Sequence, residues 1–275
     1  MFHLLFGFIS VAFLLRLIPF IFFHPSNDRD WSIDQMILPY GEINANLVHL
    51  KNIRNFSYIT SHEYIPDYYD KTFNLNKLRT VDFIVEPFDR TGLAAHTFLS
   101  FGFDNDEFVS ISIEIRKKKG DSFSPLRGLF RQYEIMYVIS DERDVVKLRV
   151  KYRKDPVYIY PVKFMEPEKL RLLFLSMIKR ANELRKTPEF YNTLNNTCMT
   201  NIVRHFNEVA DKKVFFSFKI LLPGFSDKLA YQLGLIDTNL PLKKIREHFY
   251  INNRAMKYAD SPDFSKLIRQ YDEKL

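Results

Sequence analysis

The stretch Ala94-Ala-His-Thr-Phe-Leu-Ser-Phe-Gly-Phe103 is followed by the polar turn Asp104-Asn-Asp106 and by a second apolar stretch, Phe108 to Arg116. In the second stretch, apolar Val109, Ile111, Ile113 and Ile115 alternate with a more polar set, Phe108, Ser110, Ser112 and Glu114. Alternation with a period of two is typical of a β-strand with two different faces. The two stretches therefore predict an antiparallel hairpin that folds at the turn.

Strand signals continue on both sides of this hairpin, and helices follow them. We predict strands over Ile43–Ile53, Thr80–Glu86, Tyr133–Ser140, Asp144–Lys151 and Val157–Pro161, and a loop over Ser61–Asp70. Apolar residues then recur at three and four from Pro167 to Lys186, which predicts a long amphipathic helix. Further helices are expected from near Thr197 and over Ser226–Leu233, Leu242–Ala259 and Pro262–Tyr271. The fold class is α+β, with an antiparallel sheet packed against helices.

The first residues form a separate apolar segment. From Met1 to Phe23 only His3, Ser10 and Arg16 interrupt the apolar run. About 20 apolar residues are needed for an α-helix to cross a bilayer. A cleaved signal would end at small residues, whereas bulky Phe residues here run into His24. We expect residues 1–24 to be a transmembrane anchor and residues 25–275 to be an extracytoplasmic domain.

Composition narrows the chemistry. The 275 residues, 46% of them hydrophobic, suffice to bury a full core. The net charge of +7 comes from dispersed Lys and Arg residues, and an exported chain would rarely meet nucleic acid, so we expect none as a partner. The single cysteine excludes an internal disulfide and a zinc site with two thiolates of this chain. We expect no metal and no cofactor.

The one cysteine stands where a nucleophile is expected. Cys198 follows Leu194-Asn-Asn-Thr197 and falls in the first turn of a predicted helix. The helix dipole and the free backbone N–H groups at such a position lower a thiol pKa, and the same groups can form an oxyanion hole. The alternative is a small apolar cysteine that fills a gap in the core. The polar neighbours of Cys198 favour the nucleophile.

A general base and an orienting group are needed beside the thiol. Among seven histidines, we favour His96, which lies in the predicted hairpin and shares its face with Phe98 and Ser100. The hairpin would set the polar face of the next strand beside it, which makes Glu114, and then Ser112, the candidate orienter. Two alternatives remain open: His96 as a half-buried sheet histidine, and the polar face as the solvent side of the sheet. The enzyme interpretation requires the Cys198 sulfur within about 4 Å of the His96 ring.

Several stretches together resemble the N-terminal periplasmic domain of Lnb-type lipoprotein N-acyltransferases. The similarity runs from about Trp31 to the C-terminus. The matching stretches are Asn52–Phe56, Ala95–Phe101, Ser112–Arg116, Glu134–Tyr137, Asp141–Asp144, Tyr191–Cys198, Leu222–Phe225 and Asp263–Ser265.

The resemblance implies a circularly permuted papain-like (NlpC/P60-like) fold, in which the histidine strand precedes the cysteine helix. It implies that Cys198 takes an acyl group as a thioester, that His96 activates it, and that Ser112 or Glu114 orients the imidazole. We expect the substrate to meet Arg54, Asn55, Asn196 and Thr197, which lie in the matching stretches. The donor would be a membrane phospholipid and the acceptor a lipoprotein, at the periplasmic side of the inner membrane, where the chain would be a single-pass protein.

Two other functions are consistent with the same residues. A cell-wall peptidase or amidase of the NlpC/P60 type would use the same thiol on peptide bonds. A non-catalytic envelope protein would bind a partner through the aromatic loop Tyr64 to Tyr69 and would not need Cys198. Many apolar and aromatic residues near the site would favour the acyl enzyme over the peptidase, whereas a binding protein should keep its function when Cys198 is replaced with Ser.

Overall fold

A computed structural model describes residues 23–89, 91–163 and 166–271. The main sheet has eight strands, with the order β1-β2-β9-β8-β7-β6-β10 and with β5 paired to β2. The strands are β1 (Tyr40–Asn44), β2 (Leu47–Arg54), β5 (Tyr68–Asn74), β6 (Leu78–Pro87), β7 (Ala95–Phe103), β8 (Glu107–Arg116), β9 (Glu134–Ser140) and β10 (Tyr158–Pro161). A separate two-stranded sheet joins β3 (Ser57–Tyr58) to β4 (Tyr64–Ile65).

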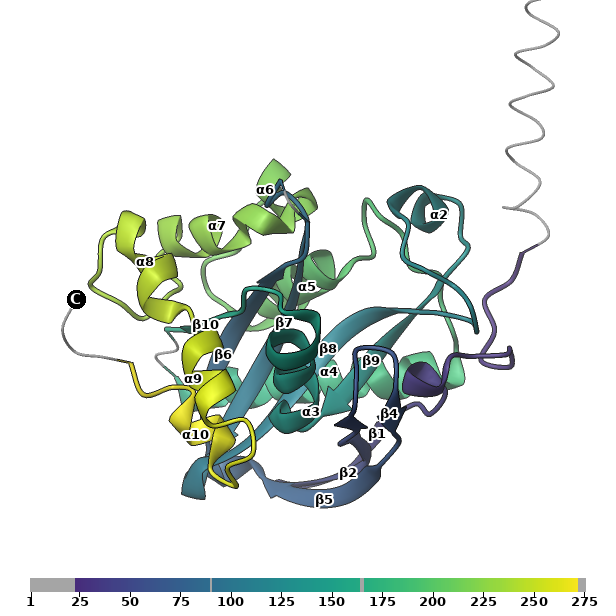
Figure 1. The fold of residues 1–275 in the computed structure, drawn as a ribbon, viewed down its shortest axis with the longest axis horizontal. Coiled ribbons are helices and arrows are strands. Elements are labelled where there is room, and N and C mark those ends of the chain that lie inside the picture. The colour runs from purple at the N-terminus through teal and green to yellow at the C-terminus, as the bar shows by residue number, and fades with distance from the viewer. Residues whose placement is uncertain (1–22, 90, 164–165, 272–275) are drawn as a thin grey trace, which may run out of the picture.

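Helices cover both faces of the sheet (Figure 1). On one face α4 (Pro167–Lys186), α5 (Cys198–Val209), α7 (Ser226–Gln232) and α8 (Leu242–Phe249) contribute to the larger apolar core. On the other face a smaller core forms beneath α3 (Glu142–Lys147), the π-helix Leu148–Arg153, α9 (Asn252–Lys257) and α10 (Phe264–Leu267). The remaining short helices are α2 (Pro125–Leu129) and α6 (Phe218–Leu221), and Ile220 of α6 also belongs to the larger core. The predicted α+β class is confirmed.

The predicted hairpin forms as β7 and β8, and its register positions the site. The two strands pair antiparallel from Phe98–Ser112 to Phe103–Glu107. The polar face of β8 therefore lies beside the face of β7 that carries His96, as the alternation predicts. Residues 95–97 of β7 extend past the last β8 partner while still pairing with β6.

Five expected elements differ in the structure, the first being the predicted helix Pro262–Tyr271, which is helical only at α10. Residues 144–151 are helical because Asp141 accepts a hydrogen bond from the backbone N–H of Arg143 and caps α3, so the predicted strand is wrong. The stretch predicted as the strand Ile43–Ile53 is split between β1 and β2 by a turn in which Ala45 has φ 49°. The expected loop at 61–70 contains β4 and the start of β5. The predicted helix Leu242–Ala259 is broken into α8 and α9.

The transmembrane prediction falls almost entirely outside the described residues, which begin at Phe23. Within the described parts of the chain, no helix is long and apolar enough to cross a bilayer. The division into an anchor at 1–24 and a domain at 25–275 stays a prediction.

Candidate active site

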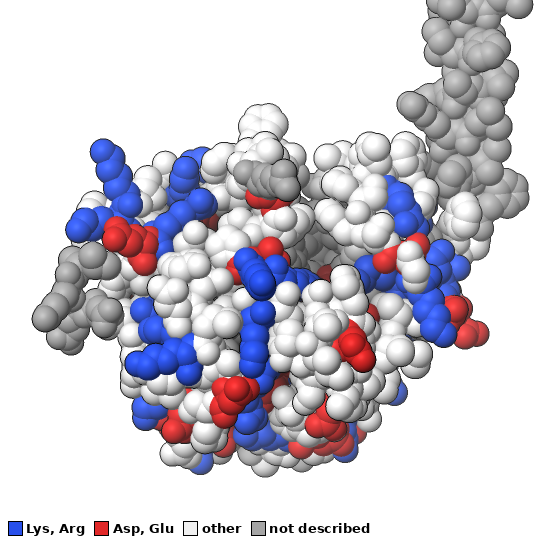
Figure 2. All heavy atoms as spheres, in the orientation of Figure 1, with Lys and Arg blue, Asp and Glu red and all other residues white. Residues whose placement is uncertain are grey.

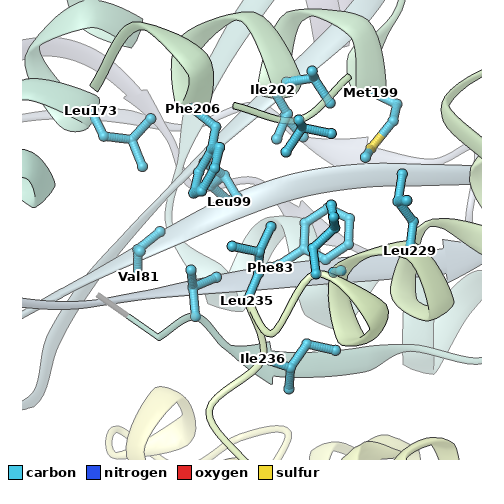
Figure 3. A pocket seen from close by; sticks show the side chains of 15 residues that line it. Val81, Phe83, Leu99, Leu173, Met199, Ile202, Phe206, Leu229, Leu235 and Ile236 are labelled. Atoms are coloured by element: carbon cyan, nitrogen blue, oxygen red, sulfur yellow. The ribbon is translucent and has the colours of Figure 1, made fainter. Parts of the chain in front are cut away.

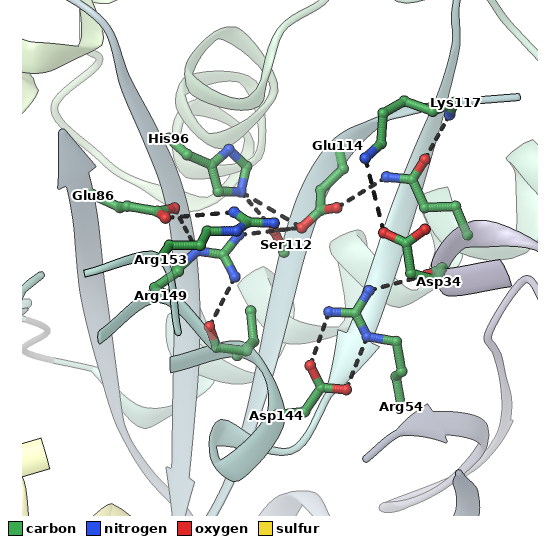
Figure 4. A network of polar contacts seen from close by, with 12 residues as sticks. Asp34, Arg54, Glu86, His96, Ser112, Glu114, Lys117, Asp144, Arg149 and Arg153 are labelled. Carbon is green, nitrogen blue, oxygen red and sulfur yellow. Dashed lines mark hydrogen bonds and ion pairs between the residues drawn. The ribbon is translucent and has the colours of Figure 1, made fainter. Parts of the chain in front are cut away.

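The structure brings three of the predicted catalytic residues together on β7 and β8 (Figure 4). Nε2 of His96 lies 2.7 Å from the hydroxyl oxygen of Ser112, and that hydroxyl donates to Oε1 of Glu114 at 2.9 Å. The direct separation between His96 Nε2 and Glu114 Oε1 is 3.8 Å. Ser112 therefore connects the imidazole to the carboxylate, so the two candidate orienters, Ser112 and Glu114, belong to one series of hydrogen bonds.

Charge keeps Glu114 ionised. Burial alone would raise the pKa of Glu114, but the guanidinium of Arg149 and the His96 ring hold it well below its usual range. Nη2 of Arg149 lies 3.4 Å from Oε1 of Glu114, and its Nε donates to Glu86. Gln35 donates a further hydrogen bond to Glu114. A fully ionised carboxylate can only accept hydrogen bonds.

This constraint fixes the proton on the imidazole. Since Glu114 only accepts, the single Ser112 hydroxyl proton points to Glu114, and Ser112 Oγ accepts from Nε2–H of His96. Burial and then the charge of Arg149 lower the pKa of His96 from 6.5 to about 4. At neutral pH the ring is therefore neutral, with its lone pair on Nδ1. We assign Nδ1 as the basic atom of the site.

Cys198 is the first residue of α5, where the sequence places it. Thr197 caps the helix: its hydroxyl accepts from the backbone N–H of Thr200, and the Thr200 hydroxyl accepts from that of Thr197. Asn196 supports the turn before the cap through hydrogen bonds to Phe190 and Asn201. These contacts orient the first backbone N–H groups of α5 around the thiol.

The thiol lies against β7. Thr97 lies close enough to Cys198 to lower the pKa of its thiol, and the Thr97 hydroxyl also approaches the sulfur of Met199 at 3.9 Å. Thr97 follows His96 directly in the strand, so the start of α5 packs against β7, as predicted, on the face that carries Thr97. Successive strand residues point to opposite faces. A direct contact between the Cys198 sulfur and the His96 ring stays a prediction.

The thiol of Cys198 is less acidic in the structure than its place at a helix start predicts. Burial raises the pKa of Cys198, while hydrogen bonds from Thr97 and from backbone N–H groups at the helix start act in the opposite direction. Cys198 is 9% exposed and belongs to the larger apolar core. In this structure, desolvation outweighs the helix terminus. The thiol and the imidazole are therefore both neutral at rest.

Arg54 and Asn55 have local structural partners. Arg54 makes a bidentate ion pair with Asp144, and both side chains are buried. Its third nitrogen donates to the carbonyl of Asp34. The backbone N–H of Asn55 donates to the carbonyl of Asp67. Arg54 thus ties β2 to α3, and a substrate contact for it, as for Asn55, Asn196 and Thr197, stays a prediction.

Sequence reasoning missed Arg149, Glu86 and Thr97, which complete the surroundings of His96. Arg149 is 3% exposed and its guanidinium also lies over the Phe98 ring, 4.9 Å from the ring centre. Arg149 stands in a segment of mixed apolar and charged residues that was predicted as a strand. The structure instead places it in the π-helix after α3.

An apolar cavity lies between α5, the sheet and α7 (Figure 3). It contains about 610 Å³ of empty space, part of it open to solvent, and its lining is apolar. Four residues of α5 contribute to it, beginning with Met199, the neighbour of Cys198. The other walls come from β6, β7, α4, α7 and nearby loops, including Phe83, Leu99, Leu173 and Leu229.

The comparisons with known proteins agree with the resemblance seen in the sequence. The family model of the Lnb N-terminal periplasmic domain matches residues 64–224, which is more than half of the chain and includes β7, β8 and Cys198. No curated protein and no solved structure matched the chain significantly. The chain therefore belongs to the Lnb N-terminal periplasmic domain family, a family of extracytoplasmic domains.

Proposed function

We propose that this protein is a periplasmic cysteine acyl enzyme of permuted papain-like architecture, anchored in the inner membrane by residues 1–24. The observation that carries the proposal is the series of hydrogen bonds that joins His96, Ser112 and Glu114. His96 directly precedes Thr97, the residue of β7 that lies beside the Cys198 thiol. A nucleophile, a base and an orienter are the parts that acyl transfer through a covalent intermediate requires.

The chemistry follows from the protonation states. In the first step the Cys198 sulfur attacks an acyl carbonyl carbon while Nδ1 of His96 takes the thiol proton. Backbone N–H groups at the start of α5 stabilise the oxyanion. The C–O or C–N bond then breaks, the leaving group takes the proton from His96, and a thioester remains. Water or an amine attacks the thioester in the second step, which makes the enzyme a hydrolase or a transferase.

The imidazolium that forms in the first step would be stabilised by the relay. His96 Nε2–H donates to Ser112, and the negative charge of Glu114 lies 3.8 Å away. Arg149 opposes this effect because its positive charge lowers the pKa of His96. The imidazolium is therefore short-lived and returns its proton to the leaving group readily, which suits a general acid.

The cavity favours acyl chains over peptides as the substrate. A peptide substrate needs polar partners for its backbone groups, and an apolar wall leaves them without hydrogen bonds. A hydrocarbon chain needs only apolar surface, which the cavity provides from Met199 onward. Phospholipid or lipoprotein acyl groups would fit this site, whereas a cell-wall peptidase would need a polar groove.

A series of p-nitrophenyl acyl esters tests the proposal against the two alternatives. We expect Cys198-dependent release of nitrophenol that increases with chain length up to the depth of the cavity. Cys198→Ala should abolish it. Preferential cleavage of cell-wall peptides would favour the amidase. No Cys198-dependent turnover of either substrate class would favour a binding protein.

A further inference from the structure

The three most exposed large apolar side chains of the described residues lie in one short segment. Phe215, Phe218 and Phe216 are 82%, 74% and 71% exposed. The rings of Phe216 and Phe218 are in edge contact, with their centres 5.8 Å apart. Isolated exposed apolar residues are common on soluble proteins, but a contiguous aromatic cluster indicates an interaction surface.

The fold holds these rings outward. Val214, just before them, is buried, and Asn207 bonds both its backbone N–H and its carbonyl at 2.7 and 2.9 Å. Ile220, just after them, is buried as well. The segment 215–218 is thus fixed at both ends by core residues. The three phenylalanine rings are therefore exposed in the folded protein, and not because the segment is unfolded.

Positive charge surrounds the cluster. Lys212 and Lys213 precede the aromatic residues, and Lys219 follows them within α6. The nearest acidic residue in sequence, Asp211, is paired with Lys169. Figure 2 shows uncharged side chains projecting at the upper edge of the molecule, where Figure 1 places α6, with Lys and Arg atoms close by. Aromatic side chains flanked by lysines are typical of segments that enter the interface of an anionic bilayer.

The cluster continues toward the candidate site. The backbone N–H of Gly224, after α6, donates to the carbonyl of Leu93 in the connection between β6 and β7. Leu93 is 40% exposed and lies three residues before His96. In the same connection, exposed Phe88 contacts exposed Phe123, which precedes α2. Figure 1 shows α6, this connection and α2 along one side of the molecule.

We propose that the segment Lys212–Lys219 docks onto an anionic phospholipid surface, with Phe215, Phe216 and Phe218 inserted among the acyl chains and the lysines at the headgroups. Val214 also lines the apolar cavity, so the docked segment is continuous with that cavity. The contact is separate from any anchoring by residues 1–24. It needs neither Cys198 nor His96, so its test is independent of the proposed catalysis.

Tryptophan quenching by brominated lipids measures the insertion in the full-length protein. Phe216→Trp reports on the segment, and Ile65→Trp, at a 60% exposed position of β4, is the matched control. Both variants share the buried Trp31 as background. In phosphatidylglycerol vesicles with brominated chains, we expect quenching and a blue shift for Phe216→Trp and neither for Ile65→Trp. Equal quenching of both, or of neither, would overturn the proposal.

Charge reversal tests the role of the lysines. Lys212→Glu with Lys213→Glu and Lys219→Glu, made in the Phe216→Trp protein, should strongly reduce the quenching in anionic vesicles. The control reverses three lysines elsewhere on the surface, Lys77, Lys186 and Lys257, and should leave the quenching unchanged. Equal effects of the two triple variants would contradict a local basic surface. Cys198→Ala should retain full quenching, and loss of quenching in this variant would contradict the independence of the two sites.

Discussion

Nε2 of His96 lies 2.7 Å from Oγ of Ser112, sixteen residues further along the chain. The hairpin between β7 and β8 creates this contact. At this end of the hairpin Phe98 pairs with Ser112, and His96 lies two residues before Phe98 on the same face of the sheet. The contact selects one tautomer of the imidazole and leaves Nδ1 as the base. The Ser112 hydroxyl is therefore a positioning group in the proposed chemistry.

Ser112→Ala should slow acylation of Cys198 by roughly 100-fold, since a misplaced or wrongly protonated imidazole forfeits much of general-base catalysis. Ser110→Ala is the matched control, because Ser110 is buried on the same strand and its hydroxyl has no hydrogen-bond partner among the described residues. Stopped-flow measurement of nitrophenol release gives both rates. Equal rates for the two variants would show that Ser112 does not position His96.

His96 should make the protein sensitive to acid. In the unfolded chain it takes up a proton near pH 6.5, whereas in the folded protein its pKa is about 4. Stability is therefore greatest above pH 6.5 and falls as the pH decreases toward 4, by up to about 3 kcal/mol for this group. Urea unfolding at several pH values measures the loss, which should be smaller in His96→Gln. Identical losses in the two proteins would contradict the lowered pKa.

Arg54→Ala should destabilise the fold by about 3 to 5 kcal/mol, because it leaves Asp144 buried without its partner. Arg79→Ala breaks an exposed pair with Asp104 and should cost less than about 1 kcal/mol. Thermal and urea unfolding compare the two variants. If Arg54→Ala kept full stability and lost only activity, Arg54 would be a substrate contact, as first expected from the sequence.

The strongly periodic elements could be predicted from the sequence, and the contacts around the site only in part. The helix Pro167–Lys186 has the predicted bounds, and the polar face of β8 meets His96 as alternation requires. The segment 144–151, which mixes apolar and charged residues, was predicted as a strand but is helical, and the carboxylate of Asp141 caps its first helix. Arg149 reaches residues 63 and 35 positions away, and such contacts depend on tertiary packing.

Ala230→Phe should separate long from short substrates. Ala230 lines the apolar cavity, and a phenyl ring there would occupy space that a long acyl chain requires. We expect turnover of long-chain esters to fall about tenfold or more, with short-chain turnover retained. Nitrophenyl esters of increasing length measure the ratio. A parallel loss at all chain lengths would mean that the cavity does not hold the acyl chain.

The most direct test of the central claim is the intact mass of the full-length protein after acid-quenched incubation with phospholipid vesicles, with lysophospholipid measured in the same samples. The account predicts a mass increase of one acyl group on Cys198, removable by hydroxylamine, together with lysophospholipid, and neither in Cys198→Ala. Lysophospholipid without a detectable thioester would still agree with the account if its formation required Cys198, because a rapidly hydrolysed thioester does not accumulate. Absence of both products, or their undiminished formation by Cys198→Ala, would contradict the acyl-enzyme account.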